Sequence, residues 1–211
     1  MTDLQLKTIE SYNKTAQNYE LTIAQLSNYD HTYDYLADLL NNGNLVLDLA
    51  CGSAKISRYI AAKKNLQVTG VDLSDEMLEI ARMKLPDGIF YKSSIIDFQK
   101  EEKYHAVIIG FGLPYLNQEQ TVQCLQNAIK LIHDHKYLYI SFMQGTGHRV
   151  EKTSFGGDNE FLLYYHDAEL IKKTLKNTKA SIIKEYEIPY TEADGSITKD
   201  IIIIAQKDKT L

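Results

Sequence analysis

Two aspartates and a glycine have the types and spacing that a nucleoside-containing ligand needs. Residues 47–57, LDLACGSAKIS, read as a strand with Asp48 near its end, a turn of small residues through Gly52, and a helix from about residue 54. Asp72 stands at the end of the next predicted strand, twenty positions after Gly52. A carboxylate at this place can accept hydrogen bonds from both hydroxyls of a ribose. The spacing therefore predicts a nucleotide-type site.

The turn departs from the three-glycine pattern of dinucleotide sites. Ala50, Gly52 and Lys55 occupy the three glycine places, and a lysine at the third disfavours close packing of helix against strand. Asp48 beside the turn would repel a pyrophosphate, which needs the helix N-terminus, and would favour a cationic ligand. These residues count against an NAD(P)-dependent oxidoreductase, which we keep as an alternative.

The spacing of apolar residues predicts the elements that hold these residues. Residues 3–26 and 31–41 have helical periodicity, and from residue 45 short apolar strands alternate with helices. The predicted strands are 45–50, 66–73, 88–93, 104–111 and 136–143, and the predicted helices are 54–64, 74–85 and 118–132, the last capped by Asn117 and Gln120. This alternation predicts a parallel sheet covered on both faces, with ligands bound at the carboxyl ends of its strands.

The last third of the chain has a different pattern. Residues 144–160 are glycine-rich and polar, which is typical of a flexible flap, and Asp167 is the expected N-cap of a following helix. Strands at 180–190 and 196–207 flank Asp194 and Gly195, a pair that favours a hairpin turn. We therefore predict one α/β domain over 1–211, with a doubly wound, mostly parallel seven-stranded sheet and a C-terminal antiparallel hairpin. Its parts are a helical N-terminal cap (1–42), a cofactor-binding core (43–143), a flap (144–165) and a C-terminal helix and hairpin (166–211).

The segments VLDLACGSA and VTGVDLS resemble the cofactor site of the class I S-adenosylmethionine-dependent methyltransferases, and the order of strands and helices resembles their Rossmann-like core. The resemblance implies S-adenosylmethionine as cofactor and methyl transfer by in-line displacement. It implies that Asp48 and the turn hold the methionine part, that Asp72 binds the ribose, and that residues after the next strands pack by the adenine and the methyl group. The implied cofactor-binding residues are Tyr19, Asp48, Ala50, Cys51, Gly52, Ala54, Asp72, Leu73, Met77, Ser94, Ile95 and Phe111.

Three departures from the family pattern are specific. Ala50 and Ala54 replace the outer glycines of the family's turn, and each adds a methyl group where the cofactor comes close. Ser94 replaces an acidic residue and removes a charged acceptor for the adenine amine, a loss of about 1 to 2 kcal/mol. His105 stands where an aspartate commonly opens the fourth strand, a position that we interpret as structural.

The resemblance also indicates where the methyl acceptor binds. Ala16 and Tyr19 match an Ala-x-x-Tyr run in the family's helical cap, so Tyr19 would close over the cofactor and is a candidate catalytic residue. His166, at the start of a predicted helix after the flap, is the first candidate for a general base, with His148 second and local packing as the competing interpretation. The candidate residues of the acceptor pocket are Tyr12, Tyr29, Tyr33, Tyr115, His148 and His166. None of them distinguishes an N, O, C or S acceptor.

Composition limits the partners. A net charge of -5 without a block of lysines and arginines argues against a nucleic-acid partner, as does the lack of a side-chain acceptor in Leu113-Pro114-Tyr115 for a nucleobase amine. Cys51 and Cys124 are too few for a disulfide scaffold, and no ligand spacing supports a metal site. The longest apolar run, at 201–205, is far shorter than the ~20 residues of a membrane helix, and the N-terminus lacks the pattern of a signal peptide. We expect a cytoplasmic monomer or homodimer with a small-molecule substrate, and a non-catalytic S-adenosylmethionine-binding protein stays as a second alternative.

Overall fold

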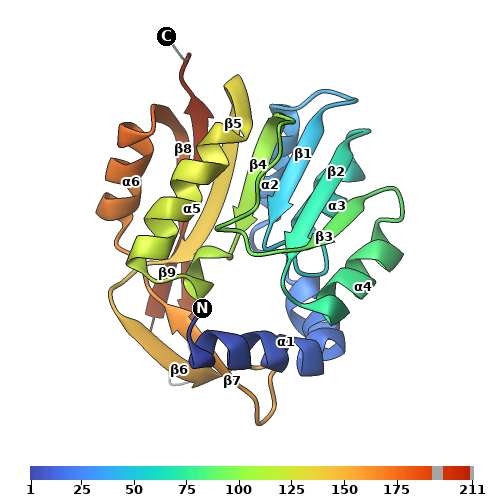
Figure 1. Cartoon of the computed structure of the whole chain (residues 1–211), viewed down its shortest axis with the longest axis vertical. Helices are drawn as coiled ribbons and strands as arrows, with labels where there is room; N and C mark the ends of the chain where they lie inside the picture. The colour runs from blue at the N-terminus through green and yellow to red at the C-terminus, as the bar shows by residue number, and fades with distance from the viewer. Residues whose placement is uncertain (192–196, 210–211) are drawn as a thin grey trace.

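A computed structural model describes residues 1–191 and 197–209 of the chain. Its centre is one seven-stranded sheet with the order β3-β2-β1-β4-β5-β9-β8 (Figure 1). Strands β1 to β5 are parallel, and β9 is antiparallel to both β5 and β8. The strands are β1 (Leu45–Leu49), β2 (Gln67–Asp72), β3 (Ile89–Lys92), β4 (Tyr104–Gly110), β5 (Ile132–Met143), β8 (Ala180–Thr191) and β9 (Ile197–Lys207). The predicted mostly parallel sheet with an antiparallel hairpin is confirmed. The predicted turn at Asp194 and Gly195 lies outside the described residues.

Strand order reverses between β1 and β4, which lie side by side at the middle of the sheet. In doubly wound sheets the crevice for a ligand forms at this reversal, outside the carboxyl ends of the strands. Asp48 and Leu49 end β1, and Gly110 ends β4. The candidate site must therefore be built from the turns that follow these residues.

Helices cover both faces of the sheet. On one face, α5 (Gln118–Lys130) and α6 (Ala168–Asn177) pack on Leu47, Leu49 and Val107, and on the other, α2 (Asp30–Asp38) and α3 (Lys55–Ala61) pack on Val46 and Ile108 (Figure 1). Successive residues of a strand point to opposite faces. This alternation directs Asp48, which shares the face of Val46, toward α3.

The predicted N-terminal cap, residues 1–42, begins with the helix α1 (Asp3–Thr22), which continues into the short helix η1 (Ile23–Gln25). Thr2 and Gln5 form a reciprocal capping box at its start, a pattern that stabilises a helix N-terminus. Figure 1 shows α1 lying across the end of the sheet toward which the arrows of β1 and β2 point. It also contacts α4 (Asp75–Lys84), which follows β2. The helix therefore closes the region where the site is expected.

Residues 148–152 and 160–164 form two antiparallel strands, β6 (His148–Lys152) and β7 (Glu160–Tyr164). The sequence indicated only a glycine-rich flap here, because the alternation of these short, partly exposed strands is weak. The backbone of β7 is joined to α1: Ser11 Oγ donates to the Glu160 carbonyl oxygen at 2.8 Å, and the Leu162 amide donates to Thr8 Oγ1 at 3.0 Å. Motion of this segment stays a prediction.

Some predicted boundaries were wrong. The helix α5 ends at Lys130, two residues before the predicted end, and β5 begins at Ile132 rather than at residue 136. The exposed polar residues after Ile132 and the positive φ of His135, +62°, interrupt the apolar alternation that marks a strand. Among the described residues, no helix combines the length and the apolar character needed to cross a membrane.

Candidate functional site

The turn between β1 and α3 has an unusual backbone. Ala50, Gly52 and Ala54 all have positive φ angles, of 60°, 50° and 59°. Glycine adopts this left-handed conformation readily, whereas a residue with a Cβ atom is strained in it by about 1 kcal/mol or more. The family's glycines at positions 50 and 54 are thereby explained, because the turn needs the conformation that glycine favours.

Asp48 lies beneath this turn and is almost completely buried, with 2% of its surface exposed. The Ser57 hydroxyl, on α3, donates a hydrogen bond to its Oδ2 atom. Burial raises the pKa of Asp48 to about 7; the negative charge of Asp72 adds to this shift, and the hydrogen bonds from Ser57 oppose it. A nearby positive charge would favour the ionised form.

Asp72 joins the turn to the end of β2. Its Oδ2 accepts a hydrogen bond from the Gly52 amide at 2.8 Å, and its Oδ1 accepts one from the Ser74 amide at 2.9 Å. Ser74 in turn caps α4 by accepting from the Met77 amide at 3.2 Å. Burial raises the pKa of the Asp72 carboxyl, although these backbone hydrogen bonds lower it. The carboxylate is thus fixed at the edge of a cavity.

This first cavity, which we call the Asp72 cavity, has a volume of about 140 Å³. Its walls come from the end of β2, the start of α4, the turn after β3 and the underside of α1. The lining includes Gln5, Thr8, Ile9, Tyr12, Tyr19, Ala50, Gly52, Asp72, Leu73, Ser74, Met77, Ser94, Ile95, Ile96, Gly110, Phe111, Gly112 and Tyr115.

A second cavity of about 460 Å³, the Asp200 cavity, lies beside the first. It shares with the Asp72 cavity the residues Tyr12, Tyr19, Ala50, Gly52, Gly110, Phe111 and Tyr115. Its other walls come from α2, the β6–β7 segment and the β8–β9 hairpin, and include Tyr29, Tyr33, Asp48, Cys51, Lys55, Met143, Glu151, Phe155, Tyr190, Thr198 and Asp200. The shared residues place the two cavities in one continuous site.

Phe111 lies where the two cavities meet. Its φ angle is +51°, and its amide donates to Ser141 Oγ at 2.8 Å, which fixes this strained conformation. The glycines on either side leave no room for side chains: a Cβ at Gly110 would lie 2.2 Å from Ile56 Cδ1, and one at Gly112 would lie 2.8 Å from Ala50 Cβ. Glycine is therefore favoured on both sides of Phe111.

Aromatic rings from α1 form the opposite wall. The hydroxyls of Tyr12 and Tyr115 are hydrogen-bonded to each other, and Tyr12 also makes ring contacts with Tyr19, Phe155 and Phe161. Burial raises the pKa of Tyr115 to about 12 and raises the pKa of Tyr12 and of Tyr19 further. These hydroxyls are therefore neutral at physiological pH and act as hydrogen-bonding groups.

Most of the predicted site residues lie together in this site. The two cavities bring together Tyr12, Tyr19, Tyr29, Tyr33, Asp48, Ala50, Cys51, Gly52, Asp72, Leu73, Met77, Ser94, Ile95, Phe111 and Tyr115. Ala54 lines neither cavity and is fully buried. Its methyl group therefore does not narrow the site, whereas that of Ala50 contributes to both cavities.

The two histidines lie elsewhere. His166 is buried, and its Nε2 lies 2.8 Å from the Leu113 carbonyl oxygen, to which it must donate a proton. Burial lowers its pKa, so the ring is neutral and supports the turn at η2 (Leu113–Tyr115). His148 is exposed on β6, with its ring against Tyr164. Neither lines a cavity, and a role as a base stays a prediction.

Sequence reasoning missed Asp200. This aspartate is 4% exposed, lines the Asp200 cavity and accepts a hydrogen bond from the Tyr29 hydroxyl at 2.5 Å. A signal was present, because Asp200 alternates with Ile202 and Ile204 in β9 and so occupies the same buried face. An acidic residue on the inward face of a strand indicates either a buried partner or a site.

Part of the chain matches a known protein family. A family model described as a methyltransferase domain matches residues 46–135. A demethylmenaquinone methyltransferase of Chlamydia pneumoniae is 35% identical over 112 residues, which make up 50% of this chain and 49% of that protein. The chain thus spans about half the length of the first curated relatives that it matches.

Solved structures match nearly the whole chain. The magnesium protoporphyrin IX methyltransferase of Synechocystis PCC 6803, crystallised with S-adenosylmethionine, aligns with a TM-score of 0.73 at 19% identity over 99% of both chains. The 1,6-didemethyltoxoflavin-N1-methyltransferase of Burkholderia thailandensis aligns with a TM-score of 0.72 at 14% identity, over 97% of this chain and 88% of that one. These similarities concern the fold, and the sequence match concerns residues 46–135. Residues 46–135 thus match a family of methyltransferase domains, and nearly the whole chain has the fold of the two methyltransferases whose structures align with it.

Proposed function

We propose that this chain is an S-adenosylmethionine-dependent methyltransferase that acts on a small-molecule acceptor. One observation carries the proposal: two cavities meet at Phe111, with the Asp72 carboxylate in one and a large aromatic lining in the other. A site for two ligands whose reacting atoms must meet needs this arrangement, because holding both in line supplies much of the rate enhancement.

The residues of the turn fit the cofactor. A Cβ at Gly52 would have nothing within 4 Å, so this α-carbon faces open space beside the cavities. In the proposal, Asp72 accepts hydrogen bonds from the ribose, while Leu73, Met77 and Ile95 pack by the adenine. Asp48 faces the positively charged methionine part. Ser94 offers a neutral hydroxyl toward the adenine, and Ala50 and Cys51 complete the turn.

S-adenosylmethionine, when bound, supplies a methyl group that is already activated by a sulfonium sulfur. The chain then has to position the acceptor and exclude water, and its tyrosines and phenylalanines do both. We assign Tyr19, whose ring lies in the shared wall, to closing the site over the reacting atoms. No nucleophilic side chain is needed, and burial raises the pKa of the Cys51 thiol so far that it stays protonated.

The two aligned structures are methyltransferases of magnesium protoporphyrin IX and of 1,6-didemethyltoxoflavin, which are small molecules, and this supports a small-molecule acceptor here. The acidic charge balance counts against nucleic acid. A cytoplasmic location and a monomeric or homodimeric state stay predictions from the sequence. The oxidoreductase and the non-catalytic binding protein gain no support from the comparisons or from the site.

Titration calorimetry with S-adenosylhomocysteine and with NAD tests the proposal. We expect wild-type protein to bind S-adenosylhomocysteine and to ignore NAD. Incubation with radiolabelled S-adenosylmethionine and a broad panel of small acceptors, including a cell extract, should then transfer label. Binding of NAD in place of the homocysteine compound would support the oxidoreductase, and binding without label transfer to any acceptor would support a non-catalytic protein.

A further inference from the structure

Asp200 is a buried carboxylate in the wall of the Asp200 cavity, and it does not line the Asp72 cavity. The Tyr29 hydroxyl, at the N-terminus of α2, donates to its Oδ2 at 2.5 Å. The proximity of this carboxylate helps to raise the pKa of Tyr29, after burial itself, so the phenol keeps its proton and remains the donor. In this pair Tyr29 is therefore the donor and Asp200 the acceptor.

The register of the sheet explains how a residue near the C-terminus reaches the site. Gly110 pairs with Ser141, and Ser141 pairs with Ile202, so these three residues form one row across β4, β5 and β9. Asp200 pairs with Met143, two residues farther toward the carboxyl ends of the parallel strands. Since side chains alternate, Asp200 lies on the face of Ile202, just beyond the last row covered by α2.

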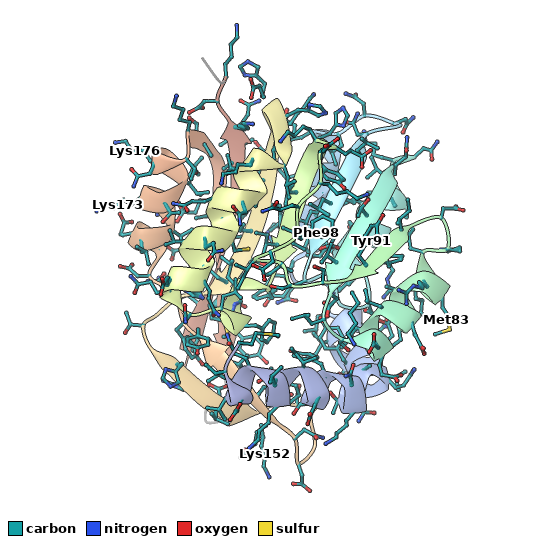
Figure 2. The ribbon with its side chains drawn as sticks, in the orientation of Figure 1. Met83, Tyr91, Phe98, Lys152, Lys173 and Lys176 are labelled. Carbon is teal, nitrogen blue, oxygen red and sulfur yellow. The ribbon has the colours of Figure 1, made fainter. Side chains whose placement is uncertain are left out.

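Acidic side chains outnumber basic ones in the lining of the Asp200 cavity. Three carboxylates, those of Asp48, Glu151 and Asp200, contribute to its lining. The Lys55 ammonium donates to the carbonyl oxygens of Ile23 and Leu26. Lys152 is exposed and its ammonium lies 3.0 Å from Asp158, and Figure 2 shows its side chain at the outer end of the molecule, away from the sheet. Both ammonium groups thus have hydrogen-bond or ion-pair partners of their own.

The walls near Asp200 are aromatic. Tyr29 meets Phe111 edge to face, with ring centroids 5.2 Å apart, and Tyr190 lies opposite Thr198 in the β8–β9 register. Both members of that pair also line the cavity. Flat aromatic walls favour a planar apolar body, because aromatic pairs stabilise each other beyond simple burial. Tyr29 contacts both Phe111 and Asp200, so a ring bound beside Phe111 would lie near this carboxylate.

From this placement we infer that Asp200, held by Tyr29, selects the acceptor: an aromatic molecule with a basic amine on the side remote from the cofactor. The inference rests on the proposed function and deepens it by naming a substrate class. A carboxylate in a protein interior attracts a cation more strongly than it would in water, and it rejects an anion of the same shape. Asp200 is a specificity residue in this proposal, and no proton transfer is assigned to it.

Three probes that share one ring test the inference: phenethylamine, 2-phenylethanol and 3-phenylpropionate, which are cationic, neutral and anionic. Their binding is measured by calorimetry with the protein saturated with S-adenosylhomocysteine. We expect phenethylamine to bind wild type at least about tenfold more tightly than 3-phenylpropionate, since a hydrogen bond to a charged group supplies a factor of this size. The alcohol should fall between them.

Two substitutions at position 200 separate recognition from structure. Asp200→Asn should bring the ratio of the amine and carboxylate affinities close to one, whereas Asp200→Glu should keep the preference for the amine. Asp34→Asn is the matched control, because it removes the same charge from an exposed ion pair with Lys63 that lines neither cavity. Binding of S-adenosylhomocysteine should be unchanged in all three variants.

The outcomes are distinguishable. Equal or tighter binding of 3-phenylpropionate to wild type, no binding of phenethylamine, or an unchanged ratio in Asp200→Asn overturns the inference while the proposed function stands. If the wild type does not bind S-adenosylhomocysteine, the proposed function itself is wrong. If Asp200→Asn does not fold, the wild-type ratio and Asp200→Glu still decide the matter.

Discussion

The backbone amide of Gly52 and the carboxylate of Asp72 are joined by a 2.8 Å hydrogen bond across the carboxyl ends of β1 and β2. The same carboxylate accepts the Ser74 amide at the start of α4. One side chain therefore connects two strand ends and a helix N-terminus. A change at Asp72 alters both the shape of the Asp72 cavity and its polarity, which makes this residue the most informative one to substitute.

Replacing Asp72 by alanine should weaken S-adenosylhomocysteine binding by more than tenfold. The substitution removes a charged acceptor for the ribose and leaves the Gly52 amide without its partner, a combined loss of about 2 kcal/mol. Titration calorimetry measures the effect. Asp75→Ala is the control, since Asp75 is an exposed carboxylate nearby, paired with Lys92, and should leave the affinity unchanged. Equal affinities of wild type and Asp72→Ala would remove the ribose assignment.

The affinity for S-adenosylmethionine should rise as the pH increases through about 7. Burial raises the pKa of Asp48 to that value, and the ionised form attracts the cationic cofactor. The neutral sulfur of S-adenosylhomocysteine should give a shallower pH dependence. Asp48→Asn should flatten the profile, and Ser57→Ala, which removes a hydrogen bond that lowers this pKa, should shift its midpoint upward. A steep profile that survives Asp48→Asn would assign the titration to another group.

The contribution of Asp48 to the free energy of unfolding should change with pH in the direction opposite to that of the cofactor affinity. The pKa in the folded protein lies above the unfolded value of about 3.9, so the folded state holds this proton more tightly. The contribution of Asp48 to the free energy of unfolding is therefore largest at low pH, falls between about pH 4 and pH 7, and is constant above that range. Urea denaturation across this range, with Asp48→Asn for comparison, measures it. The contribution is absent if both proteins show the same slope.

Gly52→Ala should weaken cofactor binding in addition to lowering the free energy of unfolding. Both Gly52 and Gly43 have positive φ, and a Cβ at either position meets nothing within 4 Å. Each alanine variant should therefore lose about 1 kcal/mol of stability from backbone strain. Only the Gly52 methyl would enter the two cavities, so Gly43→Ala is a control matched in strain. Equal cofactor affinities for the two variants would place the cofactor away from this turn.

Glu20→Gln should weaken the attachment of α1 to α3 and α4. Glu20 is buried and pairs with Arg58 of α3 at 2.7 Å and with Lys84 of α4 at 3.7 Å, which ties the cap helix to two others. Loss of this charge should cost about 2 kcal/mol and increase amide hydrogen exchange along α1. Cofactor affinity should fall as well, because Tyr12 and Tyr19 lie on the same helix. The exposed pair of Lys63 and Asp34 provides a control: Asp34→Asn should leave exchange in α1 unchanged.

The fold was predictable from the sequence because local rules and the global arrangement agree in the first two thirds of the chain. Asn117 forms the predicted reciprocal capping box with Gln120, and Asp167 caps α6 as expected. The site was predictable where the separation of two residues in the sequence indicates it, as for Gly52 and Asp72. Both lie at strand ends that any doubly wound sheet brings to the same edge.

The rest could not be predicted because it depends on contacts between distant segments. No local pattern shows that Asp200, 171 positions from Tyr29, accepts its hydrogen bond. The β6–β7 pair is stabilised in part by α1, where Ser11 donates to the Glu160 carbonyl and Thr8 accepts from the Leu162 amide, and no local sequence pattern reports these contacts. His166 looked like a candidate base from its position alone, and only the fold reveals its bond to the Leu113 carbonyl.

The left-handed alanines at positions 50 and 54 have a thermodynamic consequence. An alanine samples fewer backbone conformations than a glycine in the unfolded chain, which offsets part of the strain that it bears in the folded one. A turn built this way has little freedom left to lose when a ligand arrives. The entropy of ordering the loop is therefore lost during folding, and we expect this turn to be more preorganised for a ligand than a glycine-rich turn would be.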